Sequence, residues 1–195
     1  LAHDRARGVY DPDGFMAYIQ LPRNVSYINR KYYDNQQSRH RVNLGQRFKE
    51  ITLPPVGNEE PLVMDHLAHF LRDADDYKAY LPYIREDVLK RVMAETKILN
   101  GIGDPERWAS MLTPSEYKAL KDRVELDFVT QNKPYFGPDD PVSVTLRIKN
   151  VSSMIVKVFE INTANYYREK RREIDLAVNL DGLVATFEER KTYSD

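Results

Sequence analysis

Cysteine is absent from this chain of 195 residues, and no apolar run approaches the roughly 20 residues of a membrane-spanning helix. The first absence excludes disulfide bonds, thiolate metal ligands and cysteine nucleophiles. It is compatible with a reducing compartment without fixing one, so the localisation stays open. A formal net charge of −1 provides no positive excess that would draw the whole molecule to nucleic acid or an anionic membrane. The remaining composition, 42% hydrophobic and 30% charged, is typical of globular proteins.

The start of the chain lacks the marks of a natural N-terminus. It reads Leu1-Ala2-His3-Asp4, with neither a starting methionine nor a targeting pattern, so we expect a segment of a longer protein. The length allows one large or two modest domains. Proline, glycine and the apolar periodicity divide the chain into a loop-rich segment over 1–57, a helical region over 58–122 and a strand-rich region over 123–195.

The middle region has a helical period. Val63, Leu67 and Phe70 recur at spacings of four and three, which predicts a helix over about 60–72. A short helix over 75–80 and a longer one from Pro82 to Asn100 follow. Two further helix starts are predicted after Asp104 and at 113–116, where Thr-Pro-Ser-Glu forms a capping box.

After 121 the apolar period changes from about 3.6 to 2, the period of a strand with one face in water. Strands are predicted over 124–128, 142–148, 154–161 and 174–180, and the charged run 168–173 is predicted to be an exposed loop. The expected fold class is α+β, in which the loop-rich and helical N-terminal region precedes an antiparallel β-sandwich of macroglobulin-like or immunoglobulin-like character.

The most regular stretch of the chain is "NKPYFGPDDPVSVTLRIKNV", over 132–151, a proline- and glycine-rich turn followed by strict alternation. It resembles the macroglobulin-like β-sandwich domains of large alpha-2-macroglobulin-like proteins, although Gly137 precedes Pro138 instead of following it. The resemblance covers about 124–195 and implies a structural or interaction role. A sandwich needs roughly 100 residues, so the module is either truncated at Asp195 or completed by strands from elsewhere.

Asp65, His66 and His69 form the metal candidate. Histidines three residues apart share a helix face, and the carboxylate can complete a divalent site or orient a ring nitrogen. The alternative is that both histidines are positions at the boundary between the helix and the core. A metal-dependent hydrolase using these three residues is accordingly one alternative function.

The aspartates of Asp11-Pro12-Asp13-Gly14 are a second candidate for chemistry. The motif resembles the Asp-x-Asp-Gly nucleophile loop of haloacid-dehalogenase-type phosphotransferases, but Phe15 replaces the usual threonine. The alternative is an aspartate-rich turn.

Residues 23–49 combine cations with aromatic rings, the combination that binds single-stranded nucleic acid. Asp34 is the one acidic residue among them. A tyrosine-rich protein interface has the same composition, and the acidic residues over 59–76 can instead neutralise the segment within the fold. The residues concerned are Arg23, Tyr27, Arg30, Lys31, Tyr32, Tyr33, Arg39, Arg41, Arg47, Phe48 and Lys49.

These observations together predict a non-catalytic structural or protein-interaction segment without a cofactor, and not an enzyme. Its expected partners are protein surfaces or neighbouring domains of the same chain, because the 13 tyrosines favour interfaces. Nucleic-acid binding through 23–49 and metal-dependent hydrolysis are the alternatives.

Overall fold

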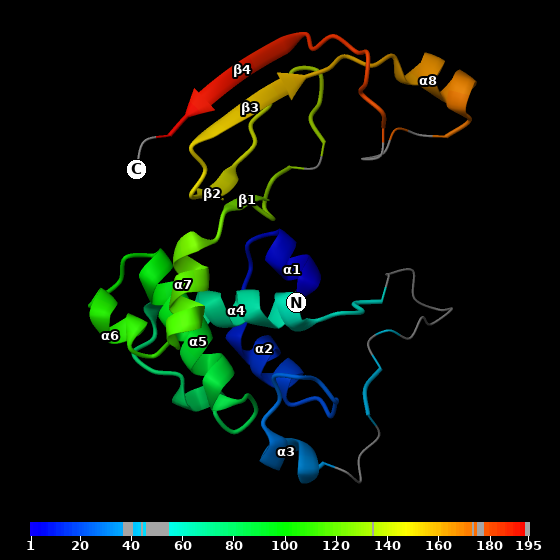
Figure 1. The fold of residues 1–195 in the computed structure, drawn as a ribbon. Helices are drawn as coiled ribbons and strands as arrows, with labels where there is room; N and C mark the ends of the chain where they lie inside the picture. Colours follow the sequence, from blue (N-terminus) through cyan, green and yellow to red (C-terminus); the bar gives the residue numbers. More distant parts are fainter. Residues whose placement is uncertain are drawn as a thin grey trace. The chain divides into compact units, whose positions relative to one another are not determined.

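The computed structural model describes residues 1–36, 41–43, 45, 55–133, 135–172, 174 and 178–193. These residues form two compact units, one made of Leu1–Arg123 with Phe128–Thr145 and the other of Val124–Asp127 with Leu146–Asp195 (Figure 1). Helices dominate the first unit and strands the second, so the predicted α+β class is confirmed. The finer division at 57 and 122 stays a prediction.

The helices of the first unit are α1 (Ala2–Ala6), α2 (Pro12–Ile19), α3 (Arg30–Asp34), α4 (Glu60–Asp73), the 3-10 helix η1 (Lys78–Tyr80), α5 (Glu86–Leu99), α6 (Pro105–Ala109) and α7 (Pro114–Asp122). The second unit contains α8 (Thr163–Lys170) and the strands β1 (Glu125–Phe128), β2 (Leu146–Lys149), β3 (Ser153–Val158) and β4 (Phe187–Thr192).

Three helices, α1 to α3, lie in the segment that the sequence predicted to be loop-rich. Two of them begin at a side-chain cap: Asp11 accepts the Asp13 amide at 3.1 Å, and Asn29 accepts the Lys31 amide at 3.0 Å. Pro12 occupies the first turn of α2, where no hydrogen bond is lost. The aspartate motif is therefore a turn that opens a helix, and the nucleophile-loop interpretation stays a prediction.

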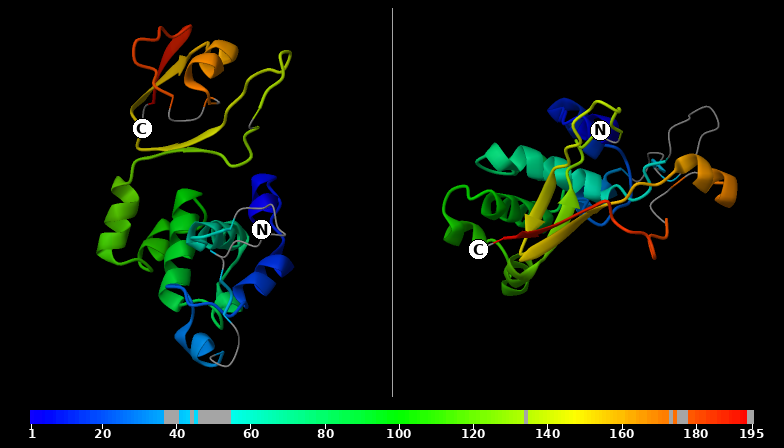
Figure 2. Two further views of the ribbon diagram at one scale, coloured as in Figure 1. Left: turned by 90° about the vertical axis from the view of Figure 1, so that its right-hand side faces the viewer. Right: turned by 90° about the horizontal axis from the view of Figure 1, so that it is seen from above.

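The core lies between α4 and α5, which pack side by side (Figures 1 and 2). Val63, Leu67 and Leu71 of α4 are fully buried, as is Leu89 of α5. Their spacing of four places the α4 residues in one apolar stripe. The sequence predicted Val63 and Leu67 in it together with Phe70, which is only partly buried, whereas Leu71 is fully buried. Fully burying a leucine or valine side chain contributes about 1.5–3 kcal/mol, so this stripe is a principal source of the unit's stability.

The start of α5 differs from its prediction, because the chain turns over 81–83 before the helix begins at Glu86. Backbone hydrogen bonds hold this turn against the N-terminal segment: the Asn29 amide donates to the Tyr83 carbonyl at 2.8 Å, and the Arg85 amide donates to the Tyr27 carbonyl at 2.9 Å. Helix geometry would use these groups within α5, so pairing with the distant segment displaces the helix start.

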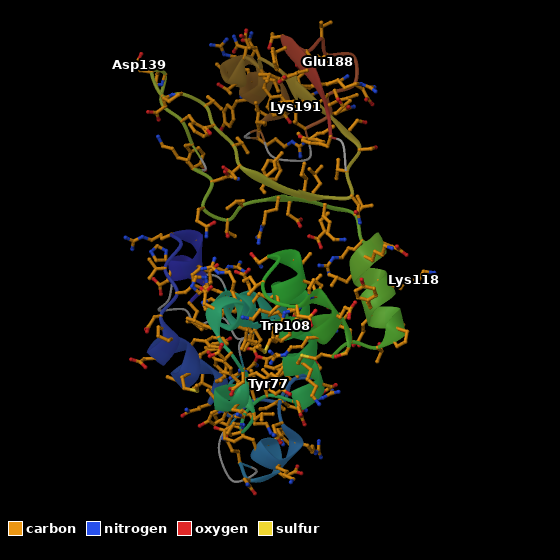
Figure 3. All side chains as sticks on the ribbon, turned by 90° about the vertical axis from the view of Figure 1, so that its left-hand side faces the viewer. Tyr77, Trp108, Lys118, Asp139, Glu188 and Lys191 are labelled. Carbon is orange, nitrogen blue, oxygen red and sulfur yellow. The ribbon has the colours of Figure 1, made fainter. Side chains whose placement is uncertain are left out.

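Trp108, the single tryptophan, holds the segment between α5 and α6. Its indole N–H donates to the Ile102 carbonyl at 2.6 Å. Gly103 has φ +73° and a Cβ built there would lie 3.2 Å from the indole, so this position favours glycine. Figure 3 shows Trp108 enclosed by side chains of the helical unit. The predicted capping box of α7 is confirmed, with Thr113 and Glu116 exchanging hydrogen bonds.

The second unit contains two short sheets among its described residues. In one, β1 pairs with β2; in the other, β3 and β4 are antiparallel, with Val158 opposite Phe187 and Met154 opposite Lys191 (Figures 1 and 2). Directly opposed residues share a face, so the apolar residues Met154, Val156, Val158 and Phe187 lie on the same face as Glu189 and Lys191. Phe187 remains 51% exposed.

Parts of two strand predictions are wrong. Residues 142–145 of the first unit and residues 174 and 178–180 of the second form no strand, and α8 stands where part of an exposed loop was expected. Residues 175–177 of the strand predicted over 174–180 lie outside the described residues. The amide of Thr145 donates to the Asn132 side chain at 2.8 Å, so part of the alternating run is held in a loop by side-chain contacts. The charged sequence of β4 has no apolar alternation, which is why the pattern did not predict it.

A buried ion pair joins the N-terminal segment to the start of α4. Arg23 Nε lies 2.5 Å from Glu59 Oε1, and both side chains are at most 4% exposed. Tyr18 and Tyr27 donate their hydroxyl hydrogens to the same carboxylate. Burial and these bonds raise the pKa of both phenols, which therefore stay protonated as donors. The group is internally satisfied, as a buried charge requires.

We expect Arg23→Met to destabilise the helical unit by about 3–5 kcal/mol, because it leaves the Glu59 carboxylate buried without its cation. The free energy of unfolding is measured by urea denaturation, followed by the fluorescence of Trp108. Arg30→Met is the matched control, since Arg30 is 78% exposed and its ion pair is with exposed Asp34. Equal small losses in the two variants would contradict the structural role of the buried pair.

Candidate functional site

His66 of α4 is the more buried of the two histidines in the predicted metal site. Its Nδ1 is 2.9 Å from the Leu62 carbonyl oxygen, and because a carbonyl only accepts, Nδ1 carries the proton. The ring stacks on Phe15 at 5.3 Å between centroids. Its Nε2 has no hydrogen-bond partner among the described residues. His66 is thus a fully buried core residue that joins α2 to α4.

The other two candidate ligands contact the N-terminal segment. The His69 ring stacks on Tyr10 at 3.8 Å, and Asp65 accepts the Tyr10 hydroxyl hydrogen at 3.1 Å. Arg5 Nη1 lies 3.7 Å from the same carboxylate. Across the described ranges, no group of three or more His, Cys, Asp or Glu side chains is arranged to hold a metal ion. The metal site and the hydrolase stay predictions; a rise in melting temperature with zinc, lost in His69→Ala, would support them.

The basic segment 23–49 is described in part, since Arg39, Arg47, Phe48 and Lys49 lie outside the described residues. Arg23 is buried against Glu59, which provides the internal neutralisation that the acidic residues suggested. Arg30 pairs with Asp34 at 3.2 Å, and the guanidinium groups of Arg30 and Arg41 lie over the Tyr33 ring. Arg23 is therefore unavailable to a nucleic-acid strand, and nucleic-acid binding stays a prediction.

A polar hollow of about 230 Å³ opens on the helical unit. We call it the arginine hollow. Its lining comes from the segment before α3, the first turn of α4, the first turns of α5 and the capping box of α7. The lining residues are Ser26, Tyr27, Glu60, Arg85, Asp87, Val88, Arg91 and Glu116.

Arg85 and Ser26 both line the hollow and are hydrogen-bonded to each other. The Arg85 guanidinium makes two hydrogen bonds to the Asp87 carboxylate, one of them from Nε at 3.0 Å, and its Nη1 donates to the Ser26 carbonyl at 3.1 Å. The Ser26 hydroxyl donates to Glu60 at 3.1 Å. Two of the carboxylates in the lining therefore already have donors.

Glu116 also lines the hollow, and its carboxylate accepts hydrogen bonds from the Thr113 amide at 2.8 Å and the Thr113 hydroxyl at 2.7 Å. These hydrogen bonds, helped by the positive charge of Arg91, lower the pKa of Glu116 against the opposing effect of Asp87. Its carboxylate is therefore ionised at neutral pH. Unlike these acids, half-buried Arg91 has no hydrogen bond or ion pair to any described residue.

The sequence analysis missed the hollow as a site. It recognised Glu116 only as a helix cap, and the spacing of Asp87 and Arg91, four residues apart on α5, is typical of an ion pair. In the structure Asp87 binds Arg85 instead, so Arg91 makes no ion pair with Asp87, although its charge acts on Glu116. The spacing of Asp87 and Arg91 suggested an ion pair between them. Only the structure shows that Arg85 binds Asp87 in place of Arg91.

Two family models match this chain, one in its N-terminal part and one in its C-terminal part. Residues 1–124 match the family model of the actin-binding protein F N-terminal domain, and residues 154–195 match that of the first immunoglobulin-like domain of the same protein. The class is thus a helical N-terminal domain followed by an immunoglobulin-like one. The chain belongs to the actin-binding protein F family.

Actin-binding protein F of Dictyostelium discoideum is 34% identical over 190 residues, which cover 95% of this chain. The chain spans about 8% of the length of that relative. No solved structure matches the chain. Among the described helices, none combines the length and the apolar character needed to cross a membrane.

These matches overturn the macroglobulin-like resemblance over 124–195. Residues 154–195 match an immunoglobulin-like domain instead. The error has a physical origin, because a turn followed by alternating strands is common to antiparallel sandwiches of many families. The pattern therefore indicated the kind of sheet without distinguishing its family.

Burial of the His66 imidazole lowers its pKa below the ordinary value of about 6.5. As the pH falls, the unfolded chain binds this proton first, so the free energy of unfolding must fall between about pH 7 and pH 5. We expect His66→Phe, which keeps a ring against Phe15, to flatten this part of the pH dependence in urea denaturation. His3→Phe, at an exposed position of α1, is the control. An unchanged slope in His66→Phe would refute the assignment.

Proposed function

We propose that this chain is a non-catalytic segment that binds actin, and that the face of the helical unit around the arginine hollow makes the contact. The observation that carries the proposal is the match of residues 1–124 to the N-terminal domain of actin-binding protein F. The relative's name states actin binding for the whole of a much longer protein. We assign that binding to this segment.

The chemistry of the arginine hollow favours binding over catalysis. A general base works best with a pKa near the operating pH, whereas the pKa of Glu116 is lowered. Asp87 is bound by Arg85 through two hydrogen bonds and its pKa is lowered by that contact, so it too is a fixed negative charge. Fixed charges of both signs around a concave surface are suited to recognising a complementary protein surface.

The second unit supports the same role in a different way. Its immunoglobulin-like match is to a fold that many cell-surface and structural proteins use as a binding or spacing module. Fold alone does not define function, so this unit is assigned no separate activity. We propose that it links the helical unit to neighbouring domains or binds protein surfaces itself.

We expect the full chain to sediment with actin filaments in a saturable way, and added salt to weaken the binding because exposed charges are screened. The measurement is the fraction of chain in the pellet as the filament concentration rises, with a sample lacking filaments as the control. A chain that stays in the supernatant at every filament concentration would overturn the proposal.

The location of the contact has its own test. Filaments should slow the amide hydrogen exchange of the first turns of α5 and α7, whose residues line the arginine hollow. Exchange that slows only elsewhere, in a chain that does bind filaments, would keep the actin-binding proposal but move its interface away from the hollow.

A further inference from the structure

We propose that Arg91 receives a carboxylate side chain of the partner protein inside the arginine hollow. The inference rests on the proposed function, in that the partner is taken to be actin, and it identifies the chemical group that the site accepts. Three features of the hollow support it: its size, the hydrogen bonds of its lining and its balance of charge.

The first feature is space. At about 230 Å³ the hollow can admit several water molecules or the end of one acidic side chain, but it is small for a folded segment. Arg91 of α5 and Glu116 of the α7 capping box both line it. A side chain that enters replaces the water around Arg91, which strengthens any charge interaction made there.

The second feature is the difference between Arg91 and its neighbours. Arg85 is committed to Asp87 and Ser26, and Glu60 and Glu116 each have a hydroxyl or amide donor. Arg91 makes none of these bonds within the described residues, although it is half-buried. Its planar guanidinium can donate two parallel hydrogen bonds to one carboxylate. These bonds would replace the hydrogen bonds to water that burial removes.

The third feature is charge. The lining carries two arginines and three acids, Glu60, Asp87 and Glu116. A phosphate group, with a charge near −2, would be repelled by these acids more strongly than a carboxylate with a charge of −1. A cationic side chain would be attracted by these acids but would leave Arg91 without an acceptor. A single carboxylate is the smallest anionic side-chain group that can accept from Arg91, and it meets the least repulsion from the three acids.

The test compares two adjacent cations of α5 in filament sedimentation with the full chain. Arg91→Ala should weaken binding by about 10- to 30-fold, the effect of a central interface residue. Lys90→Ala should change it by less than about threefold, because Lys90 does not line the hollow and pairs with Glu86 at 3.0 Å. Far-UV circular dichroism and Trp108 fluorescence verify that both variants fold.

Two further measurements identify the group. Arg91→Lys keeps the charge without the planar fork and should recover only part of the binding. Inorganic phosphate should weaken wild-type binding no more than sodium chloride of equal ionic strength. A stronger effect of phosphate would indicate a phosphate-bearing ligand, and tighter binding by Arg91→Glu would indicate a cationic partner group; either result overturns the inference.

The outcomes for the two proposals are separable. If the wild-type chain fails to sediment with filaments, the proposed function and this inference fall together. If the wild type sediments and Arg91→Ala sediments equally well, actin binding stands and the role of Arg91 is refuted.

Discussion

The helical unit depends on one buried ion pair, Arg23 with Glu59. A charge taken out of water is costly unless its partner and hydrogen bonds replace the lost solvation. Here the two tyrosines that donate to Glu59 complete that replacement. The pair fixes the start of α4 against a segment more than 30 residues earlier in the chain. A contact of this kind permits one arrangement of the N-terminal segment and penalises the alternatives.

The same cluster determines the shape of the arginine hollow. Tyr27 belongs to both: its hydroxyl hydrogen goes to Glu59, and its side chain lines the hollow. Glu60, the next residue after the buried acid, accepts the Ser26 hydroxyl hydrogen in the lining of the hollow. The backbone bond from Arg85 to Tyr27 adds the start of α5 to this assembly. The surface that we propose for binding is consequently built directly on the most constrained part of the core.

Sequence periodicity was sufficient where local pattern and burial agree, as in α4, and the capping box of α7 was readable because all its partners lie within four residues. It failed where distant contacts decide the outcome. The short helices α1 to α3 lack a long apolar stripe, and α5 begins late because Tyr83 and Arg85 bond to the N-terminal segment. The partner of Arg23 and the unpaired state of Arg91 arise from the same long-range geometry, so neither was predictable from spacing.

The exposed apolar residues at one end of the β3–β4 sheet have a practical consequence. Val158 and Phe187 are each about half exposed, and exposed apolar surface on a sheet promotes self-association. Substitutions at these positions will therefore register first in the yield and monodispersity of the purified chain. The exposed residues of this sheet therefore bear on how the chain behaves at high concentration, apart from any binding by the helical unit.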